Sequence, residues 1–491
     1  MSLQKQTMTK NTAMFLLSIA AQKAMTLVYF VIVANVFGPA EQGRYSAALA
    51  FTTLFGVFVD VGTSAMLTRQ SARDGRGVEK MVRQMFFSRI ILGIVVYGSM
   101  IALSHALNYP SELIYLISIA GIAAVIDTCS VATWSVIRGF HNLTNEAIGG
   151  VLAIGIMVGL GGSAIGLHLP LEYLVYAVLA GSVGNFLYAL WVLSHKLHIS
   201  FVPLYDWHTL KEMVLLSLPF AGAAIFSRIY TYTDATLLAS IAGEEAVGWF
   251  MAANKMILAL NLIPSSLSAS LYPTLSSFAL SSPHRISSML AKTLYVLILI
   301  VVPIAAGMVI LAPHIVSVFY NNHYLPTIGV MQVLSISMVF GFLCFPFGAL
   351  FAATNQQQKN TILYGIAATL SIVGNISLIT LFGVVGAALT ALVVSCFIFL
   401  ASLAWSQAYW KPEMPYLIRS TLKIVLATGG MALVLLSIGN ALPFAIVLIV
   451  GCATYILFCF ALRIVTKADV MLVANSLMRK GDLGVSAPTD V

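Results

Sequence analysis

The feature that most constrains this chain is a succession of apolar runs that fills residues 11–465. Several of them reach the roughly 20 residues that an α-helix needs to cross a bilayer. Charged residues make up 9% of the sequence, where soluble domains carry about 25%, and the mean hydropathy is +0.96. Because backbone amides in lipid must be paired within their own segment, the runs predict an all-α polytopic membrane protein. The first run lacks a small-residue cleavage site, so we expect it to be a retained helix.

We predict fourteen transmembrane helices, with both termini in the cytoplasm. Their ranges are 11–36, 43–67, 84–107, 112–137, 146–167, 172–194, 212–240, 247–276, 290–312, 326–353, 359–381, 384–408, 418–438 and 441–464. Lys and Arg concentrate in cytoplasmic loops, which tests the count. With this topology 21 of the 25 Lys and Arg residues fall in cytoplasmic stretches, including Arg89 at the edge of the third helix. The net charge of +8 therefore reflects topology, and we expect no nucleic-acid partner.

A short pattern occurs twice, 205 residues apart. Residues 38–48 (GPAEQGRYSAA) and 243–253 (GEEAVGWFMAA) share the pattern G-x-x-x-x-G-x-aromatic-x-A-A. An even number of predicted helices separates the copies, so they run parallel and should be related by an axis along the membrane normal. We expect two six-helix lobes, residues 1–200 and 201–410, followed by two additional helices and a cytoplasmic tail in residues 411–491.

Three basic residues, Lys23, Arg228 and Lys255, lie inside predicted helices. The repeat places Lys23 and Arg228 at equivalent positions. A charge at mid-bilayer costs at least ~2.5 kcal/mol on insertion scales, so such residues usually face a polar interior. Arginine holds phosphate oxygens through two parallel hydrogen bonds, and lysine attracts them as a point charge. We therefore predict a cleft between the lobes that binds an anionic group, a phosphate or diphosphate above all.

Further candidates for substrate binding are Arg44 at the outer mouth and the polar residues Gln22, Tyr232 and Asn254. Their alternative roles are a solvated charge for Arg44 and helix–helix hydrogen bonds for the polar residues.

Three acids lie inside predicted helices, namely Asp60, Asp127 and Asp234. A carboxylate in this setting can carry H+ or Na+, so all three are candidates for the coupling ion. Each could instead compensate a cation of the cleft, and Asp60 and Asp127 could pair with Arg69 or Arg138 near the cytoplasmic ends. Asp234 lies six residues after Arg228, about 240° around a helix, so these two share no face.

Motifs of enzymes and metal sites are missing from the sequence. It has no HExxH motif, no Walker A lysine and no CxxC pair, and its five cysteines fall inside apolar runs. His314 and His323 lie in a loop too poor in partners for a metal site. We expect a non-enzymatic protein without cofactor or metal, whose uphill transport uses an ion gradient, the membrane potential or consumption of the transported molecule.

Two longer segments resemble a known family. FGPAEQGRYSAALAFTTLFGVFVDVGTSAMLTRQSA and LPFAGAAIFSRIYTYTDATLLASIAGEEAVGWFMAANKM are similar to the second-helix region and the seventh- and eighth-helix region of bacterial polysaccharide flippases. These form the Wzx and polysaccharide-transporter branches of the multidrug/oligosaccharidyl-lipid/polysaccharide exporter superfamily. The resemblance implies two lobes around a V-shaped cavity lined by the first, second, seventh and eighth helices. Lys23, Arg228 and Lys255 fall on those helices.

The resemblance also implies a substrate and a location. The substrate would be a lipid-diphosphate-linked oligosaccharide, as in O-antigen synthesis, moved from the inner to the outer leaflet of the bacterial inner membrane. The expected partners are this glycan, membrane lipids, H+ or Na+, and a polysaccharide polymerase with other assembly proteins.

Two other functions stay open. A cation-coupled multidrug exporter of the same superfamily would have a cavity lined mainly by Asp60, Asp127 and Asp234. A membrane glycosyltransferase, polymerase or ligase would use the same lipid-linked donor. Such an enzyme generally needs a substantial outer loop with catalytic groups, whereas the predicted outer loops are short.

Overall fold

The computed structural model describes residues 2–73, 77–140, 143–281, 284–407, 414–438 and 442–464. Every regular element in these residues is helical. The first half holds α1 (Ser2–Asp60), α2 (Thr63–Arg73), α3 (Val78–Ala106), α4 (Ser111–Gly139), α5 (Leu143–Gly166) and α6 (Glu172–Lys196). The second holds α7 (Trp207–Ile241), α8 (Glu244–Leu260), α9 (Leu262–Ser281), α10 (His284–Phe319), the 3-10 helix η1 (Asn322–Tyr324), α11 (Thr327–Ala353), α12 (Gln357–Phe382) and α13 (Val384–Ser406). Last come α14 (Met414–Ile438) and α15 (Phe444–Ala461).

The number of membrane spans agrees with the sequence. In the described residues 12 helices are long and apolar enough to cross a membrane, or 13 when the bent α7 counts as one span. One of them, Leu17–Asp60, has 44 residues and would measure about 66 Å, twice the ~30 Å hydrocarbon core. It is not straight, because Gly38 interrupts α1 with φ 77° and ψ 177°. Counting its two arms separately gives the fourteen predicted spans. The all-α polytopic fold is therefore confirmed.

The two copies of the glycine motif have the same backbone conformation. Gly243, the residue before α8, has φ 87° and ψ 173°, nearly the angles of Gly38. Residues with a Cβ rarely adopt this region, so glycine is required at both positions. Each copy therefore turns from one membrane helix directly into the next at its glycine.

The second arm of α1 and α8 cross at the other glycine of each motif. A Cβ on Gly43 would lie 1.7 Å from the carbonyl oxygen of Glu244, and a Cβ on Gly248 would lie 2.0 Å from that of Pro39. Pro39 and Glu244 are themselves equivalent in the repeat, so the contact is reciprocal. The two copies meet across a local two-fold axis, in the arrangement that parallel repeats predict.

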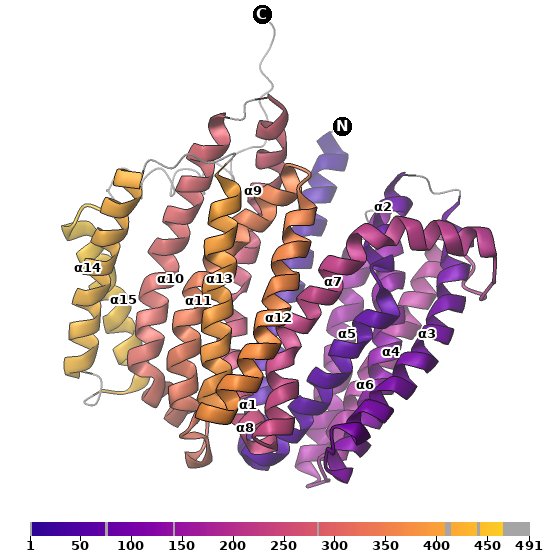
Figure 1. Ribbon diagram of the computed structural model, residues 1–491, viewed down its shortest axis with the longest axis horizontal. Helices are drawn as coiled ribbons and strands as arrows, with labels where there is room; N and C mark the ends of the chain where they lie inside the picture. The colour runs from indigo at the N-terminus through magenta and orange to yellow at the C-terminus, as the bar shows by residue number, and fades with distance from the viewer. Residues whose placement is uncertain are drawn as a thin grey trace, which may run out of the picture.

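In the described residues the most extensive apolar packing between the two halves lies at one end of the molecule. The largest cluster combines residues of both copies, among them Ala48 of α1 and Val247 of α8. At the opposite end there are two separate clusters, one with Leu67 of α2 and one with Phe347 of α11. Figure 1 shows the halves meeting where α1 and α8 cross and diverging toward α2 and the start of α1. We call these the crossing end and the α2 end.

Helix α7 is the first element of the second half, but it contacts both halves. It bends by 59° between Leu218 and Phe220. Before the bend, Met213 joins the apolar cluster of α2, α3, α4 and α6. At the bend, the backbone nitrogen of Ala221 lies 2.8 Å from where a Cβ on Gly62 would be. The predicted lobe boundary at residue 201 precedes α7 and stays a prediction, and the predicted boundary at 411 and the tail beyond 464 lie outside the described residues.

Candidate functional site

Two of the predicted cations, Lys23 on α1 and Lys255 on α8, approach each other between the halves. They are near enough for their charges to repel. The ammonium group of Lys255 lies 5.6 Å from the centroid of the Phe30 ring, within the range of a cation–π contact. The side chain of Lys23 is exposed.

The third cation, Arg228 on α7, is held by a tyrosine. Its Nη1 donates a hydrogen bond of 3.4 Å to Tyr232 Oη, and its guanidinium lies 5.8 Å from the Tyr232 ring. Tyr232 also lines a cavity together with Lys255, so it connects the two cations. In the described part of the chain, none of the three cations has a carboxylate at salt-bridge distance.

Two cavities adjoin at Thr53 on the second arm of α1. The Lys255 cavity has a volume of about 240 Å³ and is otherwise lined mainly by apolar and aromatic side chains. The Arg228 cavity has a volume of about 280 Å³, and its charged residues are Asp60, Asp127 and Arg228. Residues of both halves line each cavity, so both lie between the repeats.

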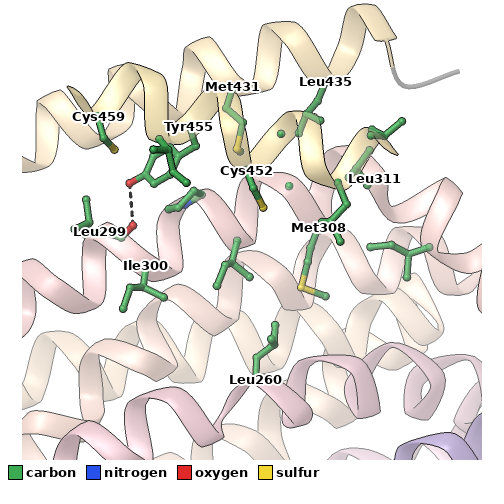
Figure 2. A pocket seen from close by; sticks show the side chains of 18 of the residues that line it. Leu260, Leu299, Ile300, Met308, Leu311, Met431, Leu435, Cys452, Tyr455 and Cys459 are labelled. Atoms are coloured by element: carbon green, nitrogen blue, oxygen red, sulfur yellow. Dashed lines mark hydrogen bonds between the residues drawn. The ribbon is translucent and has the colours of Figure 1, made fainter. Parts of the chain in front are cut away.

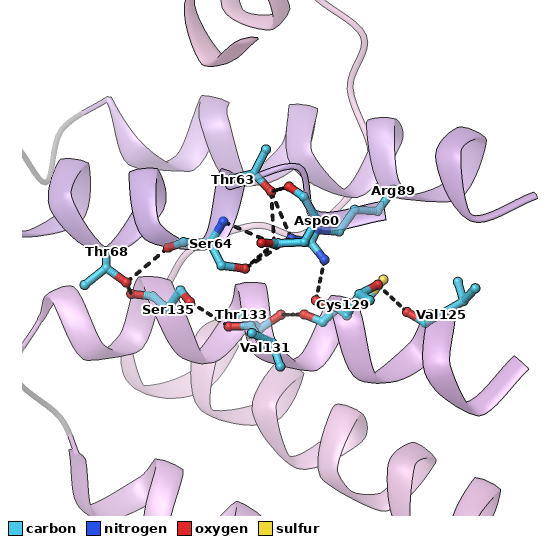
Figure 3. A network of polar contacts seen from close by, with 11 residues as sticks. Asp60, Thr63, Ser64, Thr68, Arg89, Val125, Cys129, Val131, Thr133 and Ser135 are labelled. Carbon is cyan, nitrogen blue, oxygen red and sulfur yellow. Dashed lines mark hydrogen bonds and ion pairs between the residues drawn. The ribbon is translucent and has the colours of Figure 1, made fainter. Parts of the chain in front are cut away.

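Asp60, one of the coupling-ion candidates, is paired with a buried arginine. Arg89 lies well inside α3 and is 2% exposed. Its guanidinium donates to the Asp60 carboxylate, to Thr63 Oγ1 at 2.9 Å and to the Thr128 carbonyl oxygen. The Ser64 hydroxyl also donates to Asp60. Figure 3 shows this network at the break between α1 and α2.

The buried pair corrects two expectations. Arg89 does not lie at the edge of the third span but is a fourth basic residue within the helix bundle, because α3 begins at Val78. Asp60 contacts Arg89 instead of Arg69 or Arg138, and its charge is compensated, which does not support a coupling role.

Asp127 on α4 has no ion-pair partner among the described residues. Its carboxylate accepts a hydrogen bond from the Ser182 hydroxyl on α6, and it is half-buried. Arg138, the alternative partner, is bonded to Glu146 at 3.1 Å instead. Asp127 therefore lines the Arg228 cavity with its charge uncompensated by the first half of the chain.

Asp234 lies in a polar cluster between α7 and α12. Its Oδ1 accepts hydrogen bonds from Asn375 Nδ2 at 2.7 Å and from Ser371 Oγ at 3.3 Å. Asn375 is fully buried, and its Oδ1 has no hydrogen-bond partner in the part of the chain that the structure describes. A carboxylate beside an unpaired amide oxygen is the kind of oxygen set that binds a cation.

Arg44 lies at the crossing end, surrounded by carboxylates. It forms salt bridges with Glu41 at 3.1 Å, with Glu112 at 2.8 Å and with Glu244 at 2.8 Å. Since Glu244 begins α8, this cluster joins the two copies beside the glycine crossing. Each of the three guanidinium nitrogens of Arg44 contacts a carboxylate, and these contacts do not support its predicted role in substrate binding.

The remaining predicted residues are Gln22 and Asn254. The Gln22 amide lies against Gly150 of α5, where its Nε2 would be 2.7 Å from an added Cβ. It therefore faces the first half rather than a cavity. Asn254 is half-buried and precedes Lys255 on α8.

A cavity larger than these two lies outside the predicted site, between α10, α14 and α15. It has a volume of about 680 Å³ and an almost entirely apolar lining, which Figure 2 shows. Its lining includes Met308 and Leu311 of α10, Met431 of α14 and Cys452 of α15. Leu260 of α8 also lines it, so the cavity reaches the helix that carries Lys255.

Comparison with known proteins identifies the family. The family described as "Polysaccharide biosynthesis protein" matches residues 8–279, more than half of the chain. The chain belongs to this family. A search of curated proteins found no match.

The fold of this polysaccharide biosynthesis protein is that of known transporters. A structure described as "Lipid II flippase MurJ, inward closed conformation" has a TM-score of 0.76 and 16% identity, covering 90% of this chain and 97% of the other. An inward-facing multidrug resistance MATE family transporter has a TM-score of 0.63 and 17% identity, covering 81% and 97%. A transporter from Pyrococcus furiosus Vc1, whose binding pocket is described as having reverse polarity, has a TM-score of 0.56 and 15% identity, covering 82% and 94%. The last two belong to the MOP superfamily, and the predicted resemblance is confirmed.

Sequence reasoning missed three features of this family member. Arg89 was counted with the preceding basic loop, although it follows the apolar residues Met85 and Phe86. Ser371 and Asn375 form an i, i+4 polar pair in the mainly apolar middle of α12, and this signal is present in the sequence. The apolar cavity depends on how α14 and α15 pack on α10, and no sequence pattern indicated it.

Proposed function

We propose that the protein transfers a polyprenyl-diphosphate-linked oligosaccharide from the cytoplasmic to the outer leaflet by alternating access of its two halves. Its membership of a polysaccharide biosynthesis family and its transporter fold support the general class. The assignment of the substrate rests on Lys23, Arg228 and Lys255, three cations between the halves that have no carboxylate partner among the described residues. An anionic group would compensate them.

The diphosphate is the part of this substrate that the cations would bind. Uncompensated charges at mid-membrane are costly, and a bound anion removes much of that cost. Arg228 would hold phosphate oxygens with two parallel hydrogen bonds, and the two lysines would add attraction without fixed geometry. The repulsion between Lys23 and Lys255 would also be relieved by an anion between them.

The apolar cavity offers a place for the lipid part. Its volume of about 680 Å³ lies in the ~300–1,000 Å³ range of ligand pockets, and its lining suits a hydrocarbon chain (Figure 2). Leu260, which lines it, lies five residues after Lys255, or about 7.5 Å along α8. Because five residues also turn the helix by about 140°, the cavity and Lys255 lie on different faces of α8, and a molecule with its anionic group at Lys255 would pass its chain around α8 to reach the cavity.

We assign the coupling ion to Asp234. Asn375 donates to the Asp234 carboxylate through its Nδ2 and has a buried amide oxygen with no partner among the described residues, and Ser371 adds a hydroxyl. H+ or Na+ would fit these oxygens, and the energy of its gradient would drive export. Asp60 is a weaker candidate because Arg89 compensates it.

We place the protein in the bacterial inner membrane with both termini in the cytoplasm. The distribution of basic residues supports this orientation. The α2 end would then face the cytoplasm, and the halves that diverge there would admit substrate from inside. A polysaccharide polymerase and other assembly proteins are the expected partners on the export path.

A flipping assay tests the proposal. The purified protein is placed in liposomes with a fluorescent polyprenyl-diphosphate-linked oligosaccharide, and the fraction accessible to an external quencher is followed. Arg228→Ala should abolish transfer, and Lys23→Ala and Lys255→Ala should reduce it strongly. Arg285→Ala and Lys292→Ala, which alter exposed residues on α10, are the controls. Full transfer by both the Arg228 and the Lys23 variants would overturn the mechanism.

A second pair of variants tests the lipid site alone. Gly307 lines the apolar cavity, and a Cβ there meets nothing within 4 Å. Gly307→Leu should therefore fold normally, fill the cavity and slow transfer. Gly429→Leu on α14 also has open space but is not a lining residue, so its transfer should be unchanged. Equal rates for the two variants would exclude the cavity as the lipid site.

One observation favours a second candidate, a cation-coupled multidrug exporter. Asp60 and Asp127 both line the Arg228 cavity, and acids suit cationic drugs. Drug resistance of an expressing strain decides between the two: resistance lost with Asp127→Asn but kept with Arg228→Ala would favour the exporter.

A further inference from the structure

Two opposite charges from different halves line one cavity without a partner in the described residues. Asp127 comes from α4 and Arg228 from α7, and both line the Arg228 cavity of about 280 Å³. Asp127 is bonded to the Ser182 hydroxyl, and Arg228 to the Tyr232 hydroxyl at 3.4 Å. Neither contact neutralises the charge that it touches.

The other charged groups around Asp127 are already compensated or do not line the Arg228 cavity. Asp60 of α1 and Arg89 of α3 form a buried pair with each other. On α4 itself, Arg138 is bonded to Glu146 of α5. From α6, Ser182 supplies a hydroxyl. Arg228 of α7 is therefore the cation that can form an ion pair with Asp127.

Three further charged or titratable residues lie on the helices around Asp127, two on α2 and one on α4. Arg69 and Arg73 of α2 are exposed. Cys129 of α4 lies near Arg89. Neither arginine lines the Arg228 cavity.

We propose that Asp127 is an internal competitor of the substrate for Arg228. When the site is empty, the guanidinium leaves the Tyr232 hydroxyl, its partner in this structure, for the Asp127 carboxylate across the cavity. When the substrate is bound, the guanidinium turns to the diphosphate. The inference rests on the proposed function, because it assumes that Arg228 binds an anion.

The chemistry of the three groups supports an exchange. Carboxylate and phosphate both accept two parallel hydrogen bonds from a guanidinium, so each can replace the other on Arg228. Ser227 also lines the cavity, and its hydroxyl can donate to whichever anion is not paired, whereas the Thr53 and Thr128 hydroxyls donate to carbonyl oxygens of their own helices.

The competitor would have a use in transport. A transporter that holds its anion too tightly cannot release it, and a fixed carboxylate beside the site weakens binding by like-charge repulsion. Because that carboxylate can then take the arginine, release leaves no unpaired cation behind. Asp127 is in this sense a positioning residue that acts on the substrate through Arg228.

The test measures binding of farnesyl diphosphate, a short isoprenoid diphosphate, to the full-length protein in lipid nanodiscs. Asp127→Asn should tighten binding roughly tenfold while lowering the flipping rate, because release becomes slow. Asp127→Glu keeps the carboxylate and should restore weaker binding and transfer. Melting temperatures of the variants identify any that fail to fold.

The pH profile separates competition from a structural role. Protonation removes the competing charge, so the ratio of wild-type to Asp127→Asn dissociation constants should fall toward one as the pH is lowered. A ratio is needed because the phosphate itself titrates near pH 6. Asp127→Asn should change the dissociation constant less in the Arg228→Ala background than in the wild type, and a double-mutant cycle measures this difference.

Two results would overturn the proposal in different ways. If Arg228→Ala weakens binding but Asp127→Asn changes neither affinity nor pH profile, the competitor is refuted and the proposed function stands. If Arg228→Ala leaves binding unchanged, the anion site itself fails, and the competitor with it.

Discussion

The first helices of the two copies have the same backbone conformation but different side chains at equivalent positions. Gly38 and Gly243 have nearly the same angles, and the arms that follow them cross reciprocally. Yet the residue 205 positions after Tyr29 is Asp234, the acid of the polar cluster on α12. Lys255 likewise corresponds to Ala50, which is 3% exposed in the core.

This difference between the copies shows which features of the protein the internal repeat determines and which it does not. The repeat decides where helices turn and cross, because those positions depend on the backbone and on glycine. It does not decide which half carries the ion-binding acid or the cationic residues, because side chains at equivalent positions have diverged. A symmetric scaffold can therefore hold a site for an asymmetric molecule that is anionic at one part and apolar at another.

The largest effect is expected from breaking the Asp60–Arg89 ion pair, which the second copy lacks. The position equivalent to Asp60 is Ser265. Arg89→Met leaves Asp60 unpaired inside the bundle and should lower the free energy of unfolding by about 3–5 kcal/mol. Replacing both partners, Asp60→Leu with Arg89→Met, should recover most of the loss. Denaturant unfolding of the purified protein measures it, with Arg285→Met as the control.

That prediction would fail if the single and double variants lost the same stability. The pair would then contribute through packing of the arginine stem rather than through charge, and the difference between the copies at this position would be one of volume.

The next effect tests what the copies share. Gly43→Ala and Gly248→Ala each push a Cβ into a backbone carbonyl of the other copy, at 1.7 and 2.0 Å. Both should destabilise the protein by about 2–3 kcal/mol, and by similar amounts because the contact is reciprocal. Gly155→Ala on α5, where a Cβ meets nothing within 4 Å, is the control. A large cost at one glycine and none at the other would mean that the crossing is not symmetric in solution.

A third, smaller effect tests Asp234, which stands where the first copy has Tyr29. If Asp234 holds Na+, adding the ion at ten times its dissociation constant should stabilise the wild type by about 1.4 kcal/mol. Asp234→Asn should lose this gain. Tyr29→Phe, at the equivalent position, should keep it, because the Tyr29 hydroxyl is buried without a hydrogen-bond partner. Thermal unfolding at graded concentrations of Na+ and at graded pH distinguishes Na+ from H+, and ion dependence that survives Asp234→Asn would place the ion elsewhere.

The sequence predicted the scaffold better than the site. Apolar runs, basic loops and two glycine motifs suffice for the fourteen spans and the parallel repeat, since each is a local signal. Arg89 was misplaced because a helix start at Val78 is set by tertiary packing, not by the preceding charges. The partners of Asp234 were missed because Asn375 lies 141 residues away, and only the packing of α7 on α12 brings them together.

The smallest effect concerns how the second copy is attached to the first. Asp206 caps α7 by accepting a hydrogen bond of 3.0 Å from the Thr209 amide, and it contacts Lys80 of α3 at 2.9 Å. The Lys80 ammonium, and then the Thr209 hydrogen bonds, hold the pKa of the Asp206 carboxyl well below its usual range. A lowered pKa in the folded state stabilises the protein above the unfolded value near 3.9, and this contribution is lost as the pH falls through the folded pKa.

Asparagine caps helices as well as aspartate, so Asp206→Asn removes the charge and keeps the cap. The melting temperature of the wild type should exceed that of this variant at pH 7, and the gap should close as the pH is lowered below about 4. Asp206→Ala, which removes both cap and charge, should keep a gap at low pH. If the Asp206→Asn gap did not depend on pH, the contact with Lys80 would not help to anchor α7 on the first half.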